Sequence, residues 1–500
     1  MANSKKVSKG IPYKTKSKIV MGVVIALLVL IVGGYFTYYS GIVARIIPAV
    51  KIEQTVDGKT TTIGKIYTPE LNYYRNNYIS MYSMYGVTAD EEYLNTVDQA
   101  SGKTNGQLLY DQAAEQIVTM RLVDDLAEKD SGFISGASRF AEYQLYSTEL
   151  TAKNYNYPTV GQYLSAVYGS GMSPRMFVEI VKNQEMFSEY QEYLKQFTFI
   201  PSEEEIQAVY NENPDAYLHC DFRWFYFNSA SYDDPAAAAL AVKEAAVSEN
   251  DFQLAVLNQM DEETIDKTGF TVDSKDTLMQ GLSKASLQSN AYPEDMQNYL
   301  MDPANVGKAE VFDTMYGSYV VYPLSIYEGT EATYSYRRIV LNNKNVENND
   351  DYTQEELLSG IADTQKRADE LMGTITDETS FIKAVKEHTE AYDDITTAGY
   401  TSGVMAFDFD SETLSEDDKN LSAWLLDPAR KHGDMIAIKS FSNRKVTIYY
   451  FDEVCESWKD QITNELVTKK ANEWTATLPT ETTVPQISYK VAETLSYSAQ

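Results

Sequence analysis

The sequence predicts an α+β protein with an amino-terminal transmembrane helix, a helical domain, two tandem α+β repeats and a carboxy-terminal helix that returns to the helical domain. Three observations lead to this prediction. An uncharged run follows a group of lysines near the amino terminus. Apolar residues then recur at helical spacing, and a long stretch of the second half of the chain occurs twice. The 500 residues are enough for roughly three domains of about 150 residues each.

The amino terminus has the pattern of a membrane anchor. Residues 1–18 carry six lysines, and residues 19–43 carry no charge. About 20 apolar residues span a bilayer, and basic residues favour the cytoplasmic side. We therefore expect a cytoplasmic basic segment at 1–18, an uncleaved anchor at 19–43, and a single-pass membrane protein whose bulk is extracytoplasmic. A cleaved signal peptide is the competing interpretation, but its apolar core is only about 7–15 residues long and a small-residue cleavage site follows it.

Composition excludes several classes of function. The net charge of −31 argues against nucleic acid as a partner, because binding nucleic acid needs a basic surface. The chain has no nucleotide-binding loop, no metalloprotease motif and no zinc-type cysteine spacing, so we expect no cofactor and no metal. Cys220 and Cys455 are compatible with a disulfide or with two free thiols, and the sequence leaves both open.

Residues 51–214 are expected to form the helical domain. Asp57-Gly58 between two β-rich runs predicts a hairpin, and a helix then begins near Thr68. Four residues of that helix form an apolar stripe and are candidates for client binding, although such a stripe is more often core: Tyr74, Tyr78, Met81 and Tyr85. Helix 456–477 is expected to pack against this domain, and residues 478–500, which are rich in Thr and Ser, are expected to be a mobile tail.

The repeats are expected at residues 215–329 and 332–455. Each opens on an aromatic or β-branched strand, continues into an Ala- or Leu-rich helix and closes on strands, which indicates an α+β unit. The clearest shared anchors are the Asp-Pro-Ala turns at Asp302 and Asp427 and the Phe-x-x-Ala-Val helices at Phe252 and Phe381. The offset between the copies changes along the chain, which indicates loop insertions within a duplicated globular domain.

The order of these parts resembles the SurA/PrsA-type extracytoplasmic foldases, which combine a helical chaperone domain with parvulin-type prolyl isomerase domains. In the helical domain the resemblance rests on the stretches beginning at Ile66, Asp125, Ser173 and Pro201. In the repeats it rests on the opening strands Arg223-Trp224-Phe225 and Arg337-Arg338-Ile339.

Both repeats depart from the parvulin pattern at the catalytic histidines. Where the family has Arg-His and Gly-Tyr-His, the alignment places Trp224 and Tyr319 in the first copy and Arg338 and Arg444 in the second. The chain's three histidines fall elsewhere: His219, His388 and His432. The resemblance therefore implies a retained fold with degenerate catalytic positions, and no catalytic residue is assigned.

Three hypotheses about function follow. The first is a membrane-anchored chaperone that binds unfolded, secreted or translocating polypeptides without catalysing isomerisation, with the secretion machinery as a further partner. Trp224 and Tyr319 are then candidate client-binding residues, together with the apolar stripe of the helical domain. The second is an active peptidyl-prolyl isomerase that uses other residues. The third is an envelope scaffold without chaperone activity. An aggregation-suppression assay and an isomerisation assay separate the three.

Overall fold

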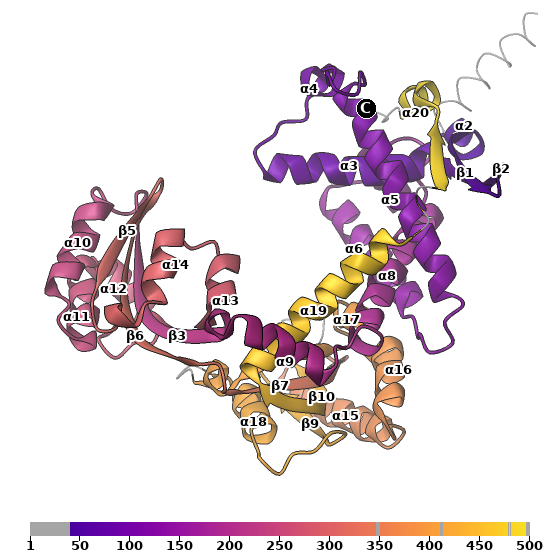
Figure 1. Cartoon of the computed structure of the whole chain (residues 1–500). Helices are drawn as coiled ribbons and strands as arrows, with labels where there is room; N and C mark the ends of the chain where they lie inside the picture. The colour runs from indigo at the N-terminus through magenta and orange to yellow at the C-terminus, as the bar shows by residue number, and fades with distance from the viewer. Residues whose placement is uncertain (1–40, 347–350, 411–413, 479, 481, 497–500) are drawn as a thin grey trace, which may run out of the picture. The chain divides into compact units, whose positions relative to one another are not determined.

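The chain folds as two compact α+β units. The structure is a computed structural model that describes residues 41–346, 351–410, 414–478, 480 and 482–496 (Figure 1). The first unit comprises the residues up to Tyr190 and those from Thr475 onward, and the second comprises Gln191–Trp474. The described residues contain three antiparallel sheets, one in the first unit and two in the second. The α+β class is therefore confirmed.

The predicted fold class is wrong in its transmembrane element. Among the residues that the structure describes, none of the helices combines the length and the apolar character needed to cross a membrane. The predicted span, residues 19–43, lies outside the described residues except for its last three positions, and these belong to a loop and to the short helix α2 (Ile42–Ile46). The expected single-pass location depends on the same segment and stays a prediction from the sequence.

The first unit is built around a small sheet with strand order β11-β1-β2. The predicted hairpin at Asp57-Gly58 is present, and both turn residues have the positive φ angles, 51° and 74°, that this kind of turn needs. The elements before the second unit are β1 (Pro48–Val56), β2 (Lys59–Tyr67), α3 (Thr68–Met84), α4 (Glu91–Asn95), α5 (Asn105–Ala127), α6 (Ala137–Asn154), α7 (Val160–Tyr168) and α8 (Pro174–Phe197). The last residues of α8, from Gln191, belong to the second unit.

The carboxy-terminal residues fold into the first unit, in contrast to the expected mobile tail. Strand β11 (Thr483–Ile487) pairs antiparallel with β1, and helix α20 (Tyr489–Leu495) places Ala492 in the core of the unit. Pro485 is tolerated because β11 is an edge strand. The Thr/Ser-rich composition suggested disorder. The segment is ordered because β1 provides a strand partner, and Thr483, Pro485 and Ile487 alternate on the more buried side of β11.

The second unit contains both repeats, each a four-stranded sheet with helices. The first copy consists of β3 (Leu218–Asn228), α10 (Pro235–Ala245), α11 (Glu249–Gln259), α12 (Glu262–Thr268), β4 (Leu278–Ser283), α13 (Lys284–Ser289), α14 (Glu294–Leu300), β5 (Glu310–Thr314) and β6 (Gly317–Glu328). The second consists of β7 (Ala332–Asn342), α15 (Gln354–Met372), α16 (Glu378–His388), α17 (Asp394–Thr397), β8 (Tyr400–Met405), α18 (Glu416–Leu425), β9 (Met435–Ser440) and β10 (Lys445–Glu456).

The two copies have the same topology. Their strand orders are β4-β3-β6-β5 and β8-β7-β10-β9. Numbered within each copy, both sheets have the order 2-1-4-3. The anchor turns also match in detail. The side chain of Asp302 accepts a hydrogen bond from the Ala304 amide at 2.9 Å, and Asp427 accepts one from the Ala429 amide at 2.9 Å. The duplication inferred from the sequence therefore agrees with the strand order and with the turns.

The copies also share an ion pair with a buried arginine and an aromatic contact. Arg223 of β3 contacts Glu249 at the start of α11 at 2.8 Å, and Arg337 of β7 contacts Glu378 at the start of α16 at 2.7 Å. A further pair joins the same helices to the closing strands: Phe252 packs on Tyr322 and Phe381 packs on Tyr450, with ring centroids 6.0 and 5.0 Å apart. These shared contacts fix the second helix of each copy, α11 and α16, against its sheet.

Each sheet is covered on both faces (Figure 1). In the first copy α10 and α11 pack on one face, and α13 and α14 pack on the other. In the second copy α15 and α16 cover one face and α18 covers the other. The central strands β3, β6, β7 and β10 are therefore largely buried, whereas β4 and β8 are edge strands at equivalent positions.

Helix α19 (Ser457–Ala476) follows the second copy, and its apolar side packs on α9 (Glu203–Glu212). Trp458 and Ile462 form a small core with Ile206 and Tyr217, and Lys459 and Lys470 pair with glutamates of α9. Helix 456–477 thus packs against the carboxy-terminal end of the segment predicted as the helical domain, residues 51–214. That end of the segment, α9 included, lies in the second unit.

Candidate functional site

The two site residues predicted in the first copy lie together on one face of its sheet. Trp224 is on β3 and Tyr319 on β6, and their ring centroids are 5.9 Å apart. Tyr226, two residues after Trp224 and therefore on the same face, lies directly opposite Tyr319 in the register, with centroids 4.5 Å apart. Tyr292, just before α14, completes the group at 6.3 Å from Trp224 and 5.9 Å from Tyr319.

These four residues, called here the aromatic cluster, form a half-buried surface rather than a sealed core. All four side chains have intermediate exposure, and Phe222, Leu287 and Met296 lie fully buried beneath them. Aromatic faces of this kind bind apolar side chains and ring systems through area and stacking. The alternation of side chains along β3 places Tyr226 on the same face as Trp224, so the sequence could have indicated it. Only the fold brings Tyr292 to this face.

The aromatic cluster contains one polar group without a partner. The Trp224 indole Nε1 is buried and has no hydrogen-bond partner among the described residues. A buried N–H without a partner costs free energy, about 1–3 kcal/mol, unless a ligand or water accepts its hydrogen bond. The Tyr226 hydroxyl, in contrast, lies 3.2 Å from Thr314 Oγ1. An acceptor such as a peptide carbonyl would satisfy the indole donor once the side chains that cover it move aside.

Three members of the aromatic cluster, Trp224, Tyr292 and Tyr319, do not exchange protons near neutral pH. Burial raises the pKa of the Tyr292 and Tyr319 hydroxyls above their ordinary value, so both stay protonated at pH 7. An indole neither gains nor loses a proton in this range. The chemistry available here is therefore stacking and hydrogen-bond donation, which suits binding more than acid–base catalysis.

The second copy has different chemistry at the equivalent positions. Arg338 occupies the place of Trp224 and is bound by the Asp394 carboxylate through two contacts of 2.9 Å. Arg444 lies in the turn before β10 with a φ of 53°, stacks on Tyr352 and donates to the Val346 carbonyl at 3.1 Å. The strand register makes Thr447, not Arg444, the counterpart of Tyr319, because Thr447 pairs with Val340 as Tyr319 pairs with Tyr226.

The alignment of Arg444 with Tyr319 is therefore corrected, and the structure does not bring Arg338 and Arg444 together. Arg338 pairs with Tyr449 of β10. Lys445, the residue after Arg444, lies four positions earlier on the same strand, which corresponds to roughly 13 Å. The turn between β9 and β10 is two residues longer than the one between β5 and β6, and the loop from Asp427 to Gly433 is one residue longer than its counterpart from Asp302 to Gly307. These three residues displaced the sequence alignment. The aromatic cluster is thus a feature of the first copy.

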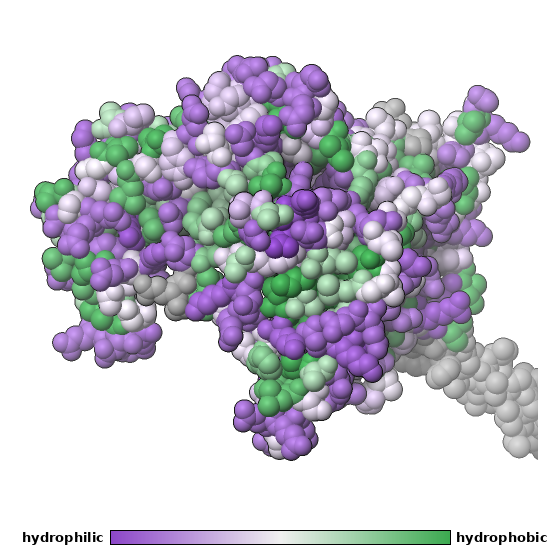
Figure 2. Space-filling model, turned by 90° about the horizontal axis from the view of Figure 1, so that it is seen from below, coloured by the Kyte–Doolittle hydropathy of each residue, from purple (hydrophilic) through white to green (hydrophobic). Residues whose placement is uncertain are grey.

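The candidate client-binding residues of the first unit divide into buried and exposed positions. Tyr74 is only 3% exposed and belongs to the core, so it is not available to a client and is removed from the candidate set. Tyr78 packs against that core, whereas Met81 and Tyr85 near the end of α3 are exposed, together with Met84. The face shown in Figure 2 likewise carries apolar residues in patches separated by polar ones.

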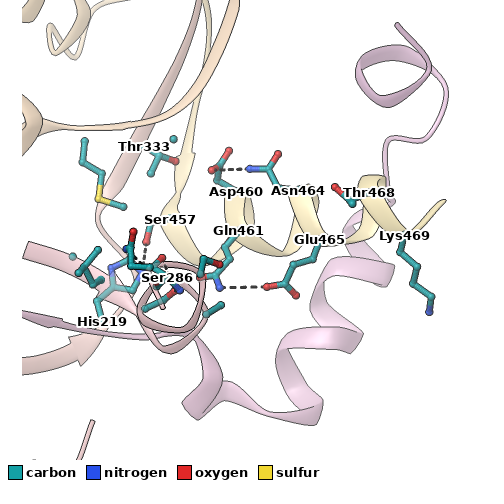
Figure 3. A pocket seen from close by; sticks show the side chains of 18 of the residues that line it. His219, Ser286, Thr333, Ser457, Asp460, Gln461, Asn464, Glu465, Thr468 and Lys469 are labelled. Carbon is teal, nitrogen blue, oxygen red and sulfur yellow. Dashed lines mark hydrogen bonds between the residues drawn. The ribbon is translucent and has the colours of Figure 1, made fainter. Parts of the chain in front are cut away.

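A polar cleft in the second unit gathers residues that no sequence motif connects. Its volume is about 960 Å³, and it lies between β4, α13, β8 and the polar side of α19. Figure 3 shows the side chains of α19 along it, with Asp460 bonded to Asn464 and Gln461 bonded to Glu465. At one end of the cleft lies His219, which is 3% exposed.

His219 and Ser457 meet there although 238 positions separate them. His219 Nε2 lies 3.2 Å from Ser457 Oγ, and His219 Nδ1 lies 3.5 Å from Glu331 Oε2. A Ser-His-Glu arrangement can serve nucleophilic catalysis, but here the Ser457 hydroxyl donates to the Gly329 carbonyl at 3.0 Å. The amides of Ser457 and Trp458 also donate to the linker between the copies. We therefore interpret this group as a structural junction.

The junction predicts a pH dependence of stability. Burial lowers the pKa of His219, and the nearby Asp221 carboxylate only partly opposes this. The unfolded chain then binds a proton more readily, with a pKa of about 6.5. Stability from the neutral imidazole is present above that pH and is lost as the pH falls below it, with a slope of at most about 1.4 kcal/mol per pH unit for one proton.

Urea unfolding from pH 8 to pH 5 measures this dependence. We expect the wild-type unfolding free energy to fall below about pH 6.5, and we expect His219→Gln to flatten the curve. His388→Gln, at an exposed position, is the matched control and should leave the slope unchanged. Identical slopes in the wild type and His219→Gln would contradict the assignment.

A comparison with protein-family models finds no match, and a search of curated proteins finds no relative. Fold and site together define an α+β protein with a duplicated four-stranded domain, one copy of which carries an aromatic surface with a free donor.

Proposed function

We propose that this chain is a chaperone that binds unfolded polypeptide segments through the aromatic cluster of its first copy, without catalysing prolyl isomerisation. The observation that carries the proposal is the indole N–H of Trp224, buried without a partner beside three tyrosines. The resemblance to SurA/PrsA-type foldases supports the same class of client. An isomerase that retains activity and a scaffold without chaperone activity are the alternatives that the tests below distinguish.

The proposed client segment is an aromatic or proline-containing stretch of chain. Proline rings and aromatic side chains pack on tyrosine and tryptophan faces, and a main-chain carbonyl accepts the indole hydrogen bond. Proline-containing segments favour an extended conformation without internal hydrogen bonds. Their main-chain carbonyls are therefore free to accept a hydrogen bond from the chaperone. Contacts of this kind do not read a particular sequence, which suits a protein that meets many unfolded clients.

Binding without catalysis follows from the residues in the cluster. Rotation about the peptide bond has a barrier of about 18–20 kcal/mol, and lowering it requires polar groups positioned around the twisted amide. Trp224 and Tyr319 stand where the family resemblance implies histidines, and burial raises the pKa of the Tyr319 hydroxyl, so it stays protonated at pH 7. The second copy, with Arg338 held by Asp394, lacks the aromatic surface and is expected to contribute little to client binding.

The experiment compares three proteins in a fluorescence-anisotropy assay with a labelled, unstructured peptide that contains aromatic and proline residues. Trp224→Ala removes the ring and the donor, and central tryptophans typically contribute 2 kcal/mol or more to binding, so we expect roughly a tenfold to hundredfold loss of affinity. Trp224→Phe keeps a ring and removes the donor, so its affinity should lie between those of the wild type and Trp224→Ala. A Gly/Ser peptide should bind none of them.

Trp474→Phe provides the control for replacing a tryptophan outside the cluster, since Trp474 lies near the end of α19 and packs on Phe199. Circular dichroism melts of all variants show whether the fold is kept. Equal affinity of wild type and Trp224→Ala, with both folded, would remove the aromatic cluster as the client site.

A further inference from the structure

Three side chains with metal-ligating atoms meet in the second copy. Glu378 begins α16, His432 lies in the loop before β9, and Asp452 lies near the end of β10. One ligand atom from each lies within 4.8 Å of the other two. The three positions come from separate parts of the chain, so their spacing in the sequence gives no indication of a site.

His432 is held with one ring nitrogen engaged by the main chain. Its Nδ1 lies 2.9 Å from the carbonyl oxygen of Asp452 and 3.4 Å from Oδ1 of the same residue, so the proton is placed on Nδ1 and the lone pair on Nε2. Histidines that bind metals commonly have this arrangement, because the second hydrogen bond orients the ring and fixes the tautomer. Nε2 lies 3.2 Å from the Tyr450 hydroxyl, which donates to it when no metal is bound.

The charges around the three groups leave a negative excess. Arg337 donates to Glu378 Oε1 from both Nε and Nη2, at 3.0 and 2.7 Å, and leaves the second oxygen of that carboxylate outside the pair. Two carboxylates face one guanidinium, so one negative charge is in excess. The Asp452 side chain is 16% exposed, so solvent screens this excess only in part. A divalent cation has the complementary charge.

The first copy shows which of these residues belong to the fold and which are additions. It has the same Arg–Glu pair, Arg223 with Glu249. The matched glycines after the anchor turns, Gly307 and Gly433, donate to the carbonyls of Pro323 and Phe451, so the counterpart of His432 is Val306.

The position of Asp452 is also matched in the first copy. In each copy one residue of the closing strand is extra in the register: Leu324 in β6 and Asp452 in β10. Bulges of this kind redirect a side chain and occur frequently beside functional sites. An apolar pair, Val306 and Leu324, thus corresponds to a histidine and an aspartate on the same framework. The fold therefore does not require these two ligands.

We propose that Glu378, His432 and Asp452 bind a divalent transition-metal ion of the Zn²⁺ type. One imidazole nitrogen and two carboxylate oxygens are ligands that Zn²⁺ accepts, and three protein ligands leave a coordination position for water or for an acceptor from outside the chain. Ca²⁺ and Mg²⁺ prefer all-oxygen sites with more ligands, so they are expected to bind weakly here. The ion would tie the loop before β9 to α16 and to β10.

The test titrates Zn²⁺ into the metal-stripped full-length chain and follows binding by isothermal calorimetry and by the shift in melting temperature. We expect one equivalent to bind the wild type and raise its melting temperature. His432→Ala should weaken binding at least about tenfold, because even residues that only orient a ligand change affinity by about 10–100-fold. The His432 side chain is 57% exposed, so its removal is compatible with folding.

His388→Ala is the matched control, because His388 is exposed on the same helix α16 beside Glu387 and outside the cluster. It should bind Zn²⁺ as the wild type does. Asp452→Asn keeps the shape of the side chain and provides the second variant, which should also lose affinity. Absence of binding by the wild type, equal binding by His432→Ala and wild type, or loss of binding in His388→Ala alone would each overturn the proposal. Binding of Mg²⁺ at the same concentration and with the same affinity would overturn the assignment of the metal class.

Discussion

Replacing Arg337 by alanine is expected to destabilise the second copy by about 3–5 kcal/mol, because the change leaves a partly buried carboxylate without its counter-charge. Arg337 is 1% exposed, donates to Glu378 and to the Gln196 side chain, and lies over the ring of Tyr400 at 4.9 Å. Its removal also leaves a cavity beneath β7. A total stability of about 5–15 kcal/mol makes this a large part of the whole.

Urea denaturation followed by fluorescence measures the loss. Lys383→Ala is the control in the same copy, because Lys383 pairs with Glu387 at 3.8 Å on the exposed side of α16 and such pairs contribute little. A loss below about 1 kcal/mol for Arg337→Ala, within the range of exposed pairs, would show that the shared Arg–Glu pair does not hold the helix to the sheet.

Ending the chain after Leu478 is expected to destabilise the first unit by several kcal/mol. The truncation removes β11, five residues of which pair with β1, and it removes Ala492 and Leu495 from buried positions. Burying a leucine side chain stabilises by about 1.5–3 kcal/mol, and each hydrogen bond adds about 1 kcal/mol. The loss of β11 also exposes one edge of β1, which favours aggregation.

Hydrogen exchange of the amides of β1 and β2 reports this effect directly. A chain that ends at Ser496 keeps β11, α20 and the hydrogen bond from Ser496 to Asn72, so it serves as the control. Unchanged protection of β1 and β2 in the shorter chain would mean that the carboxy-terminal residues add nothing to the stability of the unit.

The repeat architecture was predictable because its signals are local. The Asp-Pro-Ala turns and the Phe-x-x-Ala-Val helices each fix a short piece of backbone, and both copies carry them in the same order. Strand register was not predictable to the same degree. Four residues, 441–444, join β9 to β10 where two, 315–316, join β5 to β6, and the loop from Asp427 to Gly433 is one residue longer than the loop from Asp302 to Gly307. These three extra residues moved Arg444 onto the position of Tyr319. Only the ladder of hydrogen bonds identifies Thr447 as the counterpart.

Long-range contacts account for most of what the sequence did not show. The tail lacks a hydrophobic pattern of its own, and its order comes from β1, more than 400 positions earlier in the chain. His219 and Ser457 meet because the linker between the copies and the start of α19 converge at one point. Tyr74 and Tyr85 share one apolar stripe, yet the first is core and the second is surface, since burial depends on which neighbours the fold supplies.

The central claim, binding of polypeptide without isomerisation, is tested most directly by nuclear magnetic resonance exchange spectroscopy on a proline-containing peptide in the presence of the full-length chain. The account predicts that signals of aromatic and proline residues shift or broaden on addition of the protein. The time constant of cis/trans exchange should stay at its uncatalysed value, roughly tens to hundreds of seconds at 25 °C. Acceleration of that exchange, lost on mutation of Trp224 or Tyr319, would contradict it, and so would the absence of any change in the peptide signals.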